Sequence, residues 1–183
     1  MKILLCSLAL FLGFAGCKKS EPAALAKVDA CSLLTNAEIQ SVQGSAIVET
    51  KGNEHSDAGL RMSQCYFSAE QSSKSVSLMV TQIDPENRGQ RTPKDFWKET
   101  FGRGSVREAE HEGEKEEEEH ETALPTKIEG IGDEAYWVGS RVGGALYAIK
   151  RATFIRISVG GPDTQDVKIN KSKKLAVQAL KRL

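Results

Sequence analysis

The chain has 183 residues, of which 39% are hydrophobic, and its 25 basic and 25 acidic side chains give a formal net charge of zero. This length suits one ordinary domain that buries most of its apolar surface. A nucleic-acid-binding domain needs a concentrated basic surface, so the composition gives no reason to expect nucleic acid as a partner.

Residues 1–16 have the layout of a secretory signal, with a basic start, the apolar run Ile3–Phe14 and two small residues before Cys17. The run is too short to cross a bilayer core of ~30 Å, which needs about 20 residues. The ending Phe14-Ala15-Gly16-Cys17 resembles a bacterial lipobox. The resemblance implies that Cys17 becomes the first mature residue and carries acyl chains such as palmitate. An ordinary signal peptide, cut near Gly16 and leaving Cys17 as a free thiol, is the alternative.

An acylated Cys17 makes the membrane a partner and places the protein in the cell envelope. Residues 17–30 are polar and unpatterned, as expected of a tether between a lipid anchor and a domain. Two or more acyl chains attach a protein stably, at ~0.8 kcal/mol per buried CH₂. In a host with two membranes, Lys18 after the cysteine implies the outer membrane, facing the periplasm. Otherwise the outer face of the plasma membrane is expected.

The cysteine count predicts one disulfide. Cys6 leaves with the signal and Cys17 is acylated, so Cys31 and Cys65 remain as a pair. In an oxidising compartment two remaining cysteines are expected to bond to each other. A redox-active pair is the alternative, but no Cys-x-x-Cys spacing is present to lower a thiol pKa.

In the first half of the domain, Thr35-Asn36-Ala37-Glu38 has the spacing of a capping box and predicts a helix over Asn36–Gln43. Val76, Leu78 and Val80 alternate with less apolar residues and predict the longest of three strands that follow. The expected strands are Ala46–Glu49, Gln64–Ser68 and Ser75–Ile83, with a polar loop over Lys51–Gly59 between the first two.

In the second half, Thr92-Pro93 begins a second helix. Residues 105–124 are rich in glutamate and predict a solvated, mobile acidic insertion. The remaining elements expected are strands at Glu134–Ser140, Ala145–Lys150 and Thr153–Val159 and a final helix at Lys171–Arg182. The order, αβββ-αβββ-α-like, predicts a single α+β domain over residues 31–183, with an antiparallel sheet flanked by helices.

Three segments carry a family resemblance: Asp29–Ile39, Cys65-Tyr66 and Ile128–Tyr136. They resemble a family of bacterial, mostly actinobacterial, lipoproteins of unknown function. Its members share an Asp-x-Cys-x-Leu-Leu-Thr-x-x-Glu start and a Gly-x-Gly-Asp-Glu-Ala turn before a strand pair. The resemblance supports the anchor, the disulfide and the α+β fold, and it implies no catalytic residues.

The acidic insertion holds two candidate metal ligands, His111 and His120. Neither begins a His-Glu-x-x-His zinc motif, because Lys115 and Leu124 stand where the second histidine is required. Imidazole and carboxylate groups together suit several divalent metals. Weak metal binding or scavenging is therefore an alternative function for this segment, beside its interpretation as a solvated loop.

Other candidate site residues are few. Trp97 and Trp137 could line a ligand cleft, with Trp137 the candidate ligand-binding residue, although aromatic residues on regular elements usually belong to the core. The glycines around Ile131 indicate a turn in which Asp133 binds local backbone N–H groups. No Gly-x-Ser-x-Gly motif occurs. We therefore expect no cofactor and a non-catalytic module that binds an envelope protein or small ligand, with an enzyme of unrecognised site residues as a further alternative.

Overall fold

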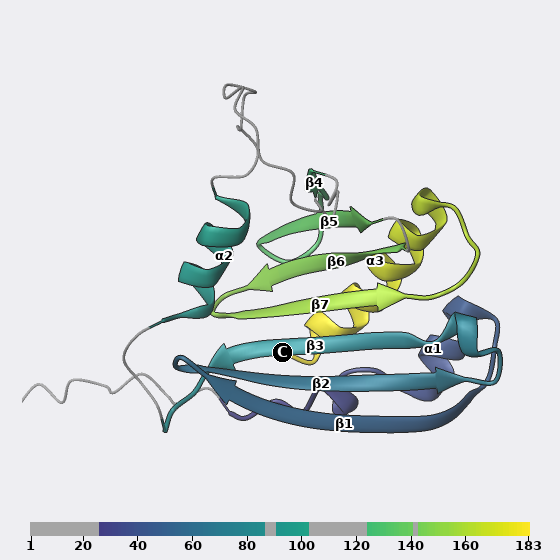
Figure 1. Cartoon of the computed structure of the whole chain (residues 1–183), viewed down its shortest axis with the longest axis horizontal. Coiled ribbons are helices and arrows are strands. Elements are labelled where there is room, and N and C mark those ends of the chain that lie inside the picture. Colours follow the sequence, from purple (N-terminus) through teal and green to yellow (C-terminus); the bar gives the residue numbers. More distant parts are fainter. Residues whose placement is uncertain (1–25, 87–90, 103–123, 141–142) are drawn as a thin grey trace, which may run out of the picture.

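The computed structural model describes residues 26–86, 91–102, 124–140 and 143–183. They form a seven-stranded antiparallel sheet in the order β1-β2-β3-β7-β6-β5-β4 (Figure 1). The strands are β1 (Ile47–Asp57), β2 (Leu60–Ala69), β3 (Val76–Ile83), β4 (Thr126–Lys127), β5 (Glu134–Ser140), β6 (Gly143–Lys150) and β7 (Thr153–Val159). The helices are η1 (Ala30–Ser32), α1 (Asn36–Gln43), η2 (Ser72–Lys74), α2 (Pro93–Phe101) and α3 (Gln165–Lys181). The predicted α+β fold is confirmed.

Local sequence explains where α1 and α2 begin. The Thr35 side chain accepts a hydrogen bond from the backbone N–H of Glu38, and the Glu38 carboxylate accepts one from the N–H of Thr35, which confirms the predicted capping box. Thr92 and Asp95 form the same reciprocal pair at the start of α2. Gly44 ends α1 in the left-handed conformation, with φ +65°.

The predicted polar loop over Lys51–Gly59 is wrong, because β1 and β2 form one long hairpin. The turn has only two residues, Ala58 and Gly59, whose φ angles of 47° and 84° suit a tight hairpin turn. Ten of the eleven residues of β1 are exposed. An edge strand of this kind lacks the apolar alternation on which the prediction rested.

The final helix also differs from its prediction, since α3 begins at Gln165 rather than Lys171. The buried residues of α3 start at Ser172, and its apolar core residues start at Leu175. The first two turns are therefore helical without an apolar stripe, and hydrophobic periodicity does not detect them.

The two faces of the sheet are covered differently. We call the face that α1, α3 and η1 cover the helical face; α1 and α3 lie behind the sheet in Figure 1. The pairing register places one row of core residues across this face: Cys65, Leu78, Ile157, Leu146 and Trp137. The opposite face carries α2, which packs on β3 and β7, and we call it the aromatic face.

The N-terminal segment enters the domain on the helical face. The backbone N–H of Val28 donates to the side chain of Gln82, whose amide donates to the carbonyl of Ala26. The N–H of Ala30 donates to Ser63 Oγ at 2.9 Å. Gln82 and Ser63 lie two positions from the core residues Val80 and Cys65 on their strands, so their side chains point to the same, helical face. Polar side chains of the sheet thus hold this segment in place.

A disulfide joins Cys31 of η1 to Cys65 of β2, as predicted, with a Cα–Cα distance of 5.0 Å. Cys65 is completely buried, and Sγ of Cys31 lies 3.2 Å from where a Cβ on Gly52 would be. The bond therefore fixes the start of the domain against the edge strand β1 and its neighbour β2.

Replacing both cysteines, as Cys31→Ser with Cys65→Ser, is expected to lower the free energy of unfolding by about 3–4 kcal/mol, because the unfolded chain regains the freedom of a loop of roughly 35 residues. Urea unfolding followed by circular dichroism measures the change. A reducing agent added to the unaltered chain should give a similar loss. A loss below about 1 kcal/mol in both experiments would contradict the role given to this bond.

Arg182, directly after α3, connects that helix to the N-terminal part of the domain. Its guanidinium donates to the carbonyl of Leu33 at 2.8 Å and to the carboxylate of Glu38 at 2.8 Å. The hydrogen bond from Arg182, and next that from the backbone N–H of Thr35, lower the pKa of Glu38 from 4.5 to about 2. The ionised form of Glu38 is therefore the one that stabilises the fold.

Because the pKa of Glu38 is lower in the folded than in the unfolded chain, its stabilisation is complete above about pH 4.5 and is lost as the pH falls toward 2. Glu38→Gln should lower the free energy of unfolding at pH 7 by about 1–2 kcal/mol. The difference from the unaltered chain should shrink between pH 4.5 and 2. Urea unfolding across this range tests the expectation, with the exposed residue Glu70, changed to Gln, as control. A pH-independent difference would contradict it.

Candidate functional site

An aromatic cluster holds α2 on the aromatic face of the sheet. Phe101 of α2 stacks on Tyr136 of β5 with ring centroids 4.8 Å apart, and Phe96 stacks on Phe154 of β7 at 5.3 Å. Trp97 lies 4.5 Å from Phe101 between these two stacks. Aromatic pairs contribute about 0.5–1.5 kcal/mol each beyond area burial, so the cluster fixes the position of this short helix.

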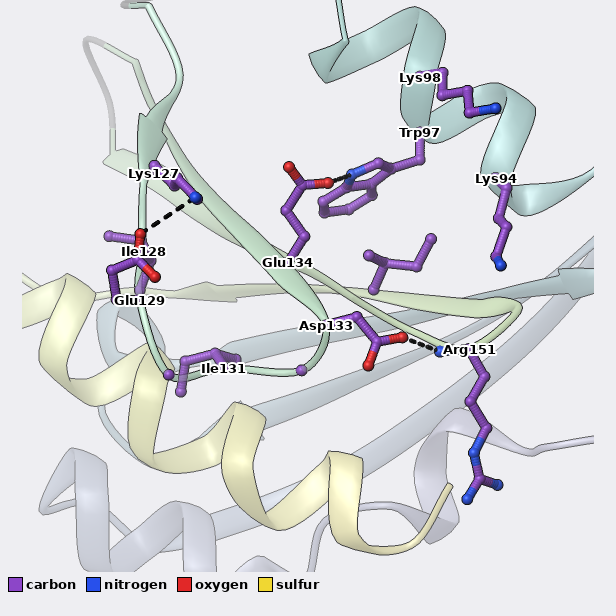
Figure 2. A pocket seen from close by; sticks show the side chains of 13 residues that line it. Lys94, Trp97, Lys98, Lys127, Ile128, Glu129, Ile131, Asp133, Glu134 and Arg151 are labelled. Carbon is purple, nitrogen blue, oxygen red and sulfur yellow. Dashed lines mark hydrogen bonds and ion pairs between the residues drawn. The ribbon is translucent and has the colours of Figure 1, made fainter.

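A partly buried polar link joins the same helix to β5. Glu134 accepts a hydrogen bond from Trp97 Nε1 at 2.6 Å and another from the hydroxyl of Tyr136 at 2.8 Å. The hydrogen bond to Glu134, followed by burial, raises the pKa of Tyr136 above its usual value. Figure 2 shows the Glu134 carboxylate meeting the indole of Trp97. The link fixes both the indole and the carboxylate in one orientation.

A pocket of about 410 Å³ lies between α2 and the loop that joins β4 to β5. Its apolar floor is made by Trp97, Ile131 and Ile149, whose side chains are 4–6% exposed. Charged residues surround the floor: Lys94, Lys98, Lys127, Glu129, Asp133, Glu134 and Arg151. The volume falls in the range of small-molecule sites, roughly 300–1,000 Å³.

The acidic groups of the pocket are all engaged by neighbours. Glu129 forms an ion pair of 3.3 Å with Lys127, and Glu134 is held by the two hydrogen bonds described above. Asp133 accepts a hydrogen bond from the backbone N–H of Arg151 at 2.6 Å. Lys94 makes no ion pair with any residue in the described ranges. The pocket can therefore offer a cationic group to a ligand.

The loop under the pocket depends on its glycines. Gly130 and Gly132 have φ angles of 78° and 59°, and a Cβ on Gly132 would lie 2.4 Å from the carbonyl oxygen of Ile149. The N–H of Asp133 donates to that same carbonyl. The prediction that Asp133 binds local N–H groups is wrong, because its partner is Arg151 in the β6–β7 turn. These contacts attach the loop to a neighbouring hairpin.

Trp137, the candidate ligand-binding residue, is 1% exposed and belongs to the core of the helical face. A Cβ on Gly144 would lie 2.4 Å from its ring, so the missing side chain at that position makes room for the indole. Trp137 does not line the pocket, whereas Trp97 does. Both tryptophans could be singled out in the sequence, but the hydrogen bond from Trp97 to Glu134 could not be foreseen there.

The other predicted site residues divide into two groups. Cys31 and Cys65 are joined, as described above. Cys17, His111 and His120 lie outside the described residues. Within the described part of the chain, no group of three or more His, Cys, Asp or Glu side chains is arranged to hold a metal ion. The same ranges contain no helix with the length and apolarity needed to cross a membrane.

No family model, curated protein or solved structure matches this chain. The resemblance to the lipoprotein family therefore stays a prediction, and the candidate site is judged on its own geometry.

Glu134→Gln is expected to move the pKa of Tyr136 back toward its usual value of 10, because the change weakens the hydrogen bond that holds the phenol proton and also removes the negative charge beside it. Absorbance at alkaline pH measures the titration, and Tyr136→Phe identifies the signal. Glu129→Gln is the matched control, since Glu129 contributes least to the raised pKa and should change it much less. An unchanged titration of Tyr136 in Glu134→Gln would contradict the polar link.

Proposed function

We propose that this chain is a lipid-anchored lipoprotein of the cell envelope, whose domain binds an envelope protein or small ligand without catalysing a reaction. Acyl chains on Cys17 attach it to the membrane once residues 1–16 are removed. In a host with two membranes it faces the periplasm from the outer membrane. In a host with one, it lies on the outer face of the plasma membrane.

The disulfide supports an extracytoplasmic location. Disulfides persist in oxidising compartments and are rare where thiols are kept reduced. The bond between Cys31 and Cys65 has one sulfur in the core, which suits a structural rather than an exchanging pair. It therefore agrees with the export signal that residues 1–16 resemble.

The single observation that carries the binding function is the pocket between α2 and the β4–β5 loop. Its floor is apolar, and its walls are fixed by the aromatic cluster and by the Glu134 and Asp133 hydrogen bonds. A site with fixed walls requires little ordering when a ligand enters, which favours affinity. Among the described residues that line it, none is a serine, threonine, cysteine or histidine, so the lining suits binding better than covalent chemistry.

The pocket also indicates what a ligand should look like. Trp97, Ile131 and Ile149 offer a small apolar surface, and Lys94 and Lys127 stand on opposite sides of it in Figure 2. Lys127 already pairs with Glu129, whereas Lys94 has no such pair among the described residues. The complementary molecule is an apolar group that carries an acidic substituent, from a small metabolite, a lipid or the side chains of an envelope protein.

The test is to release the full chain from bacterial envelopes with detergent and to weigh it intact by native mass spectrometry. The expected mass corresponds to a chain that begins at Cys17, carries acyl chains and contains one disulfide, with an envelope molecule bound to part of the population. Lys94→Glu combined with Lys98→Glu should lower the bound fraction roughly tenfold, because two favourable charge contacts become repulsive.

Lys51→Glu, on the distant edge strand β1, is the matched control and should leave the bound fraction unchanged. Cys17→Ala should lose the acyl mass. A chain that begins at Met1 with reduced thiols would overturn the anchor. A chain with nothing bound, or with equal loss in the pocket and control variants, would overturn the binding site.

A further inference from the structure

The outer surface of α3 is basic. The helix contains five lysines, Lys168, Lys171, Lys173, Lys174 and Lys181, against one acidic residue, Asp166. Lys171 pairs with Asp163 at 2.7 Å. In the described ranges, Lys173, Lys174 and Lys181 have no such partner. Three lysines are thus available to an external anionic group.

The same surface exposes apolar side chains. Val167 and Val177 are 40% and 37% exposed, and both are large hydrophobic residues at the protein surface. Their spacing places them on one stripe of the helix with Lys174 and Lys181. Basic and apolar groups that alternate along an outward stripe are typical of a helix that lies against an anionic membrane surface.

The place where the chain enters the domain gives an independent reason. Ala26 is held by Gln82 on the helical face, and Leu33 is bound by Arg182 at the end of α3. Only eight residues, 18–25, separate Cys17 from Ala26. Such a segment reaches at most about 30 Å when fully extended. A lipid on Cys17 therefore holds the point where the chain enters this face within about 30 Å of the membrane.

We infer that α3 docks the helical face on anionic lipid headgroups, with Lys173, Lys174 and Lys181 facing the phosphates and Val167 and Val177 at the level of the headgroups. The inference rests on the proposed lipid anchor, which raises the concentration of α3 at the membrane surface. Each lysine near an anionic surface is worth about fivefold in affinity. When the three lysines bind the surface together, the tethered domain takes one defined orientation on the membrane.

The experiment supplies the anchor chemically, so that it does not depend on acylation in the cell. The mature chain, residues 17–183, is coupled through the thiol of Cys17 to a maleimide lipid in vesicles. One set contains phosphatidylglycerol with phosphatidylcholine and the other phosphatidylcholine alone. Amine-reactive labelling, read by mass spectrometry, should slow at least about fivefold at Lys173, Lys174 and Lys181 on the anionic vesicles alone. Lys51, an exposed residue of the edge strand β1, should label equally on both.

A second measurement uses the uncoupled mature chain with Cys17→Ser and sedimentation with anionic vesicles. Lys173→Glu, Lys174→Glu and Lys181→Glu together should weaken binding by about fivefold per residue. Lys51→Glu, Arg91→Glu and Arg156→Glu together are the charge-matched control, since none of these residues lies on α3 or lines the pocket, and they should weaken binding much less. Circular dichroism confirms that both variants are folded.

Three outcomes would overturn the inference. One is equal labelling of α3 on the two kinds of vesicle. Another is an equal loss of binding in the two triple variants, since net charge alone would then explain it. The third is binding that appears only after residues 108–121 are deleted, because the glutamates of that segment would then be the partner of α3 in the full chain. None of these results depends on whether Cys17 is acylated in the cell or whether the pocket binds a ligand.

Discussion

The pairing of β3 with β7 is the interaction on which the rest of the fold depends. It joins residues 76–81 to residues 154–159 and unites β1, β2 and β3 with β7, β6, β5 and β4 in one sheet. Bringing such distant segments together has an entropic cost that grows with the logarithm of the loop length. Burial on both faces of the junction offsets this cost. On the helical face, Leu78 and Val80 lie beside Ile157 and Ile155, and on the aromatic face α2 contacts both strands.

The candidate site follows from the same junction. Because α2 packs on β3 and β7, its residues Lys94, Trp97 and Lys98 lie near the loop before β5. The pocket forms between these residues and the loop. Trp97 belongs to both structures, since its ring packs in the aromatic cluster while its Nε1 donates to Glu134. The shape of the pocket is therefore set by the packing that stabilises the domain.

Features that depend on local spacing, on the order of elements or on the elimination of other partners could be predicted from the sequence. The Thr35–Glu38 capping box, the α+β order and the Cys31–Cys65 bond each require only local spacing or the elimination of other partners. β1 was missed because an exposed edge strand carries no apolar alternation. The pocket was missed because it needs Lys94 and Trp97 to meet residues thirty or more positions away.

The two tryptophans show the same limit. Both stand beside other apolar residues on regular elements, so local pattern does not say which one borders a cavity. The strand register decides the matter, because it aligns Trp137 with Leu146 on the helical face and Tyr136 with Tyr147 on the other. Gly144 then supplies the space that the Trp137 ring fills. Side-chain direction along β5 could be known only once its partner strand was known.

The long hairpin that begins the sheet has a consequence for chains crowded side by side on one surface. When such chains lie side by side, the edge strand of one molecule comes next to the edge strand of another. Its unpaired backbone N–H and C=O groups can then pair with the neighbour and extend the sheet. Along β1 this edge is interrupted by a bulge between Ile47 and Glu49 and by the charges of Glu49, Lys51 and Glu54. Irregular and charged edges resist such growth. The polar sequence that conceals β1 from apolar-pattern prediction is thus also one that opposes edge-to-edge pairing of strands.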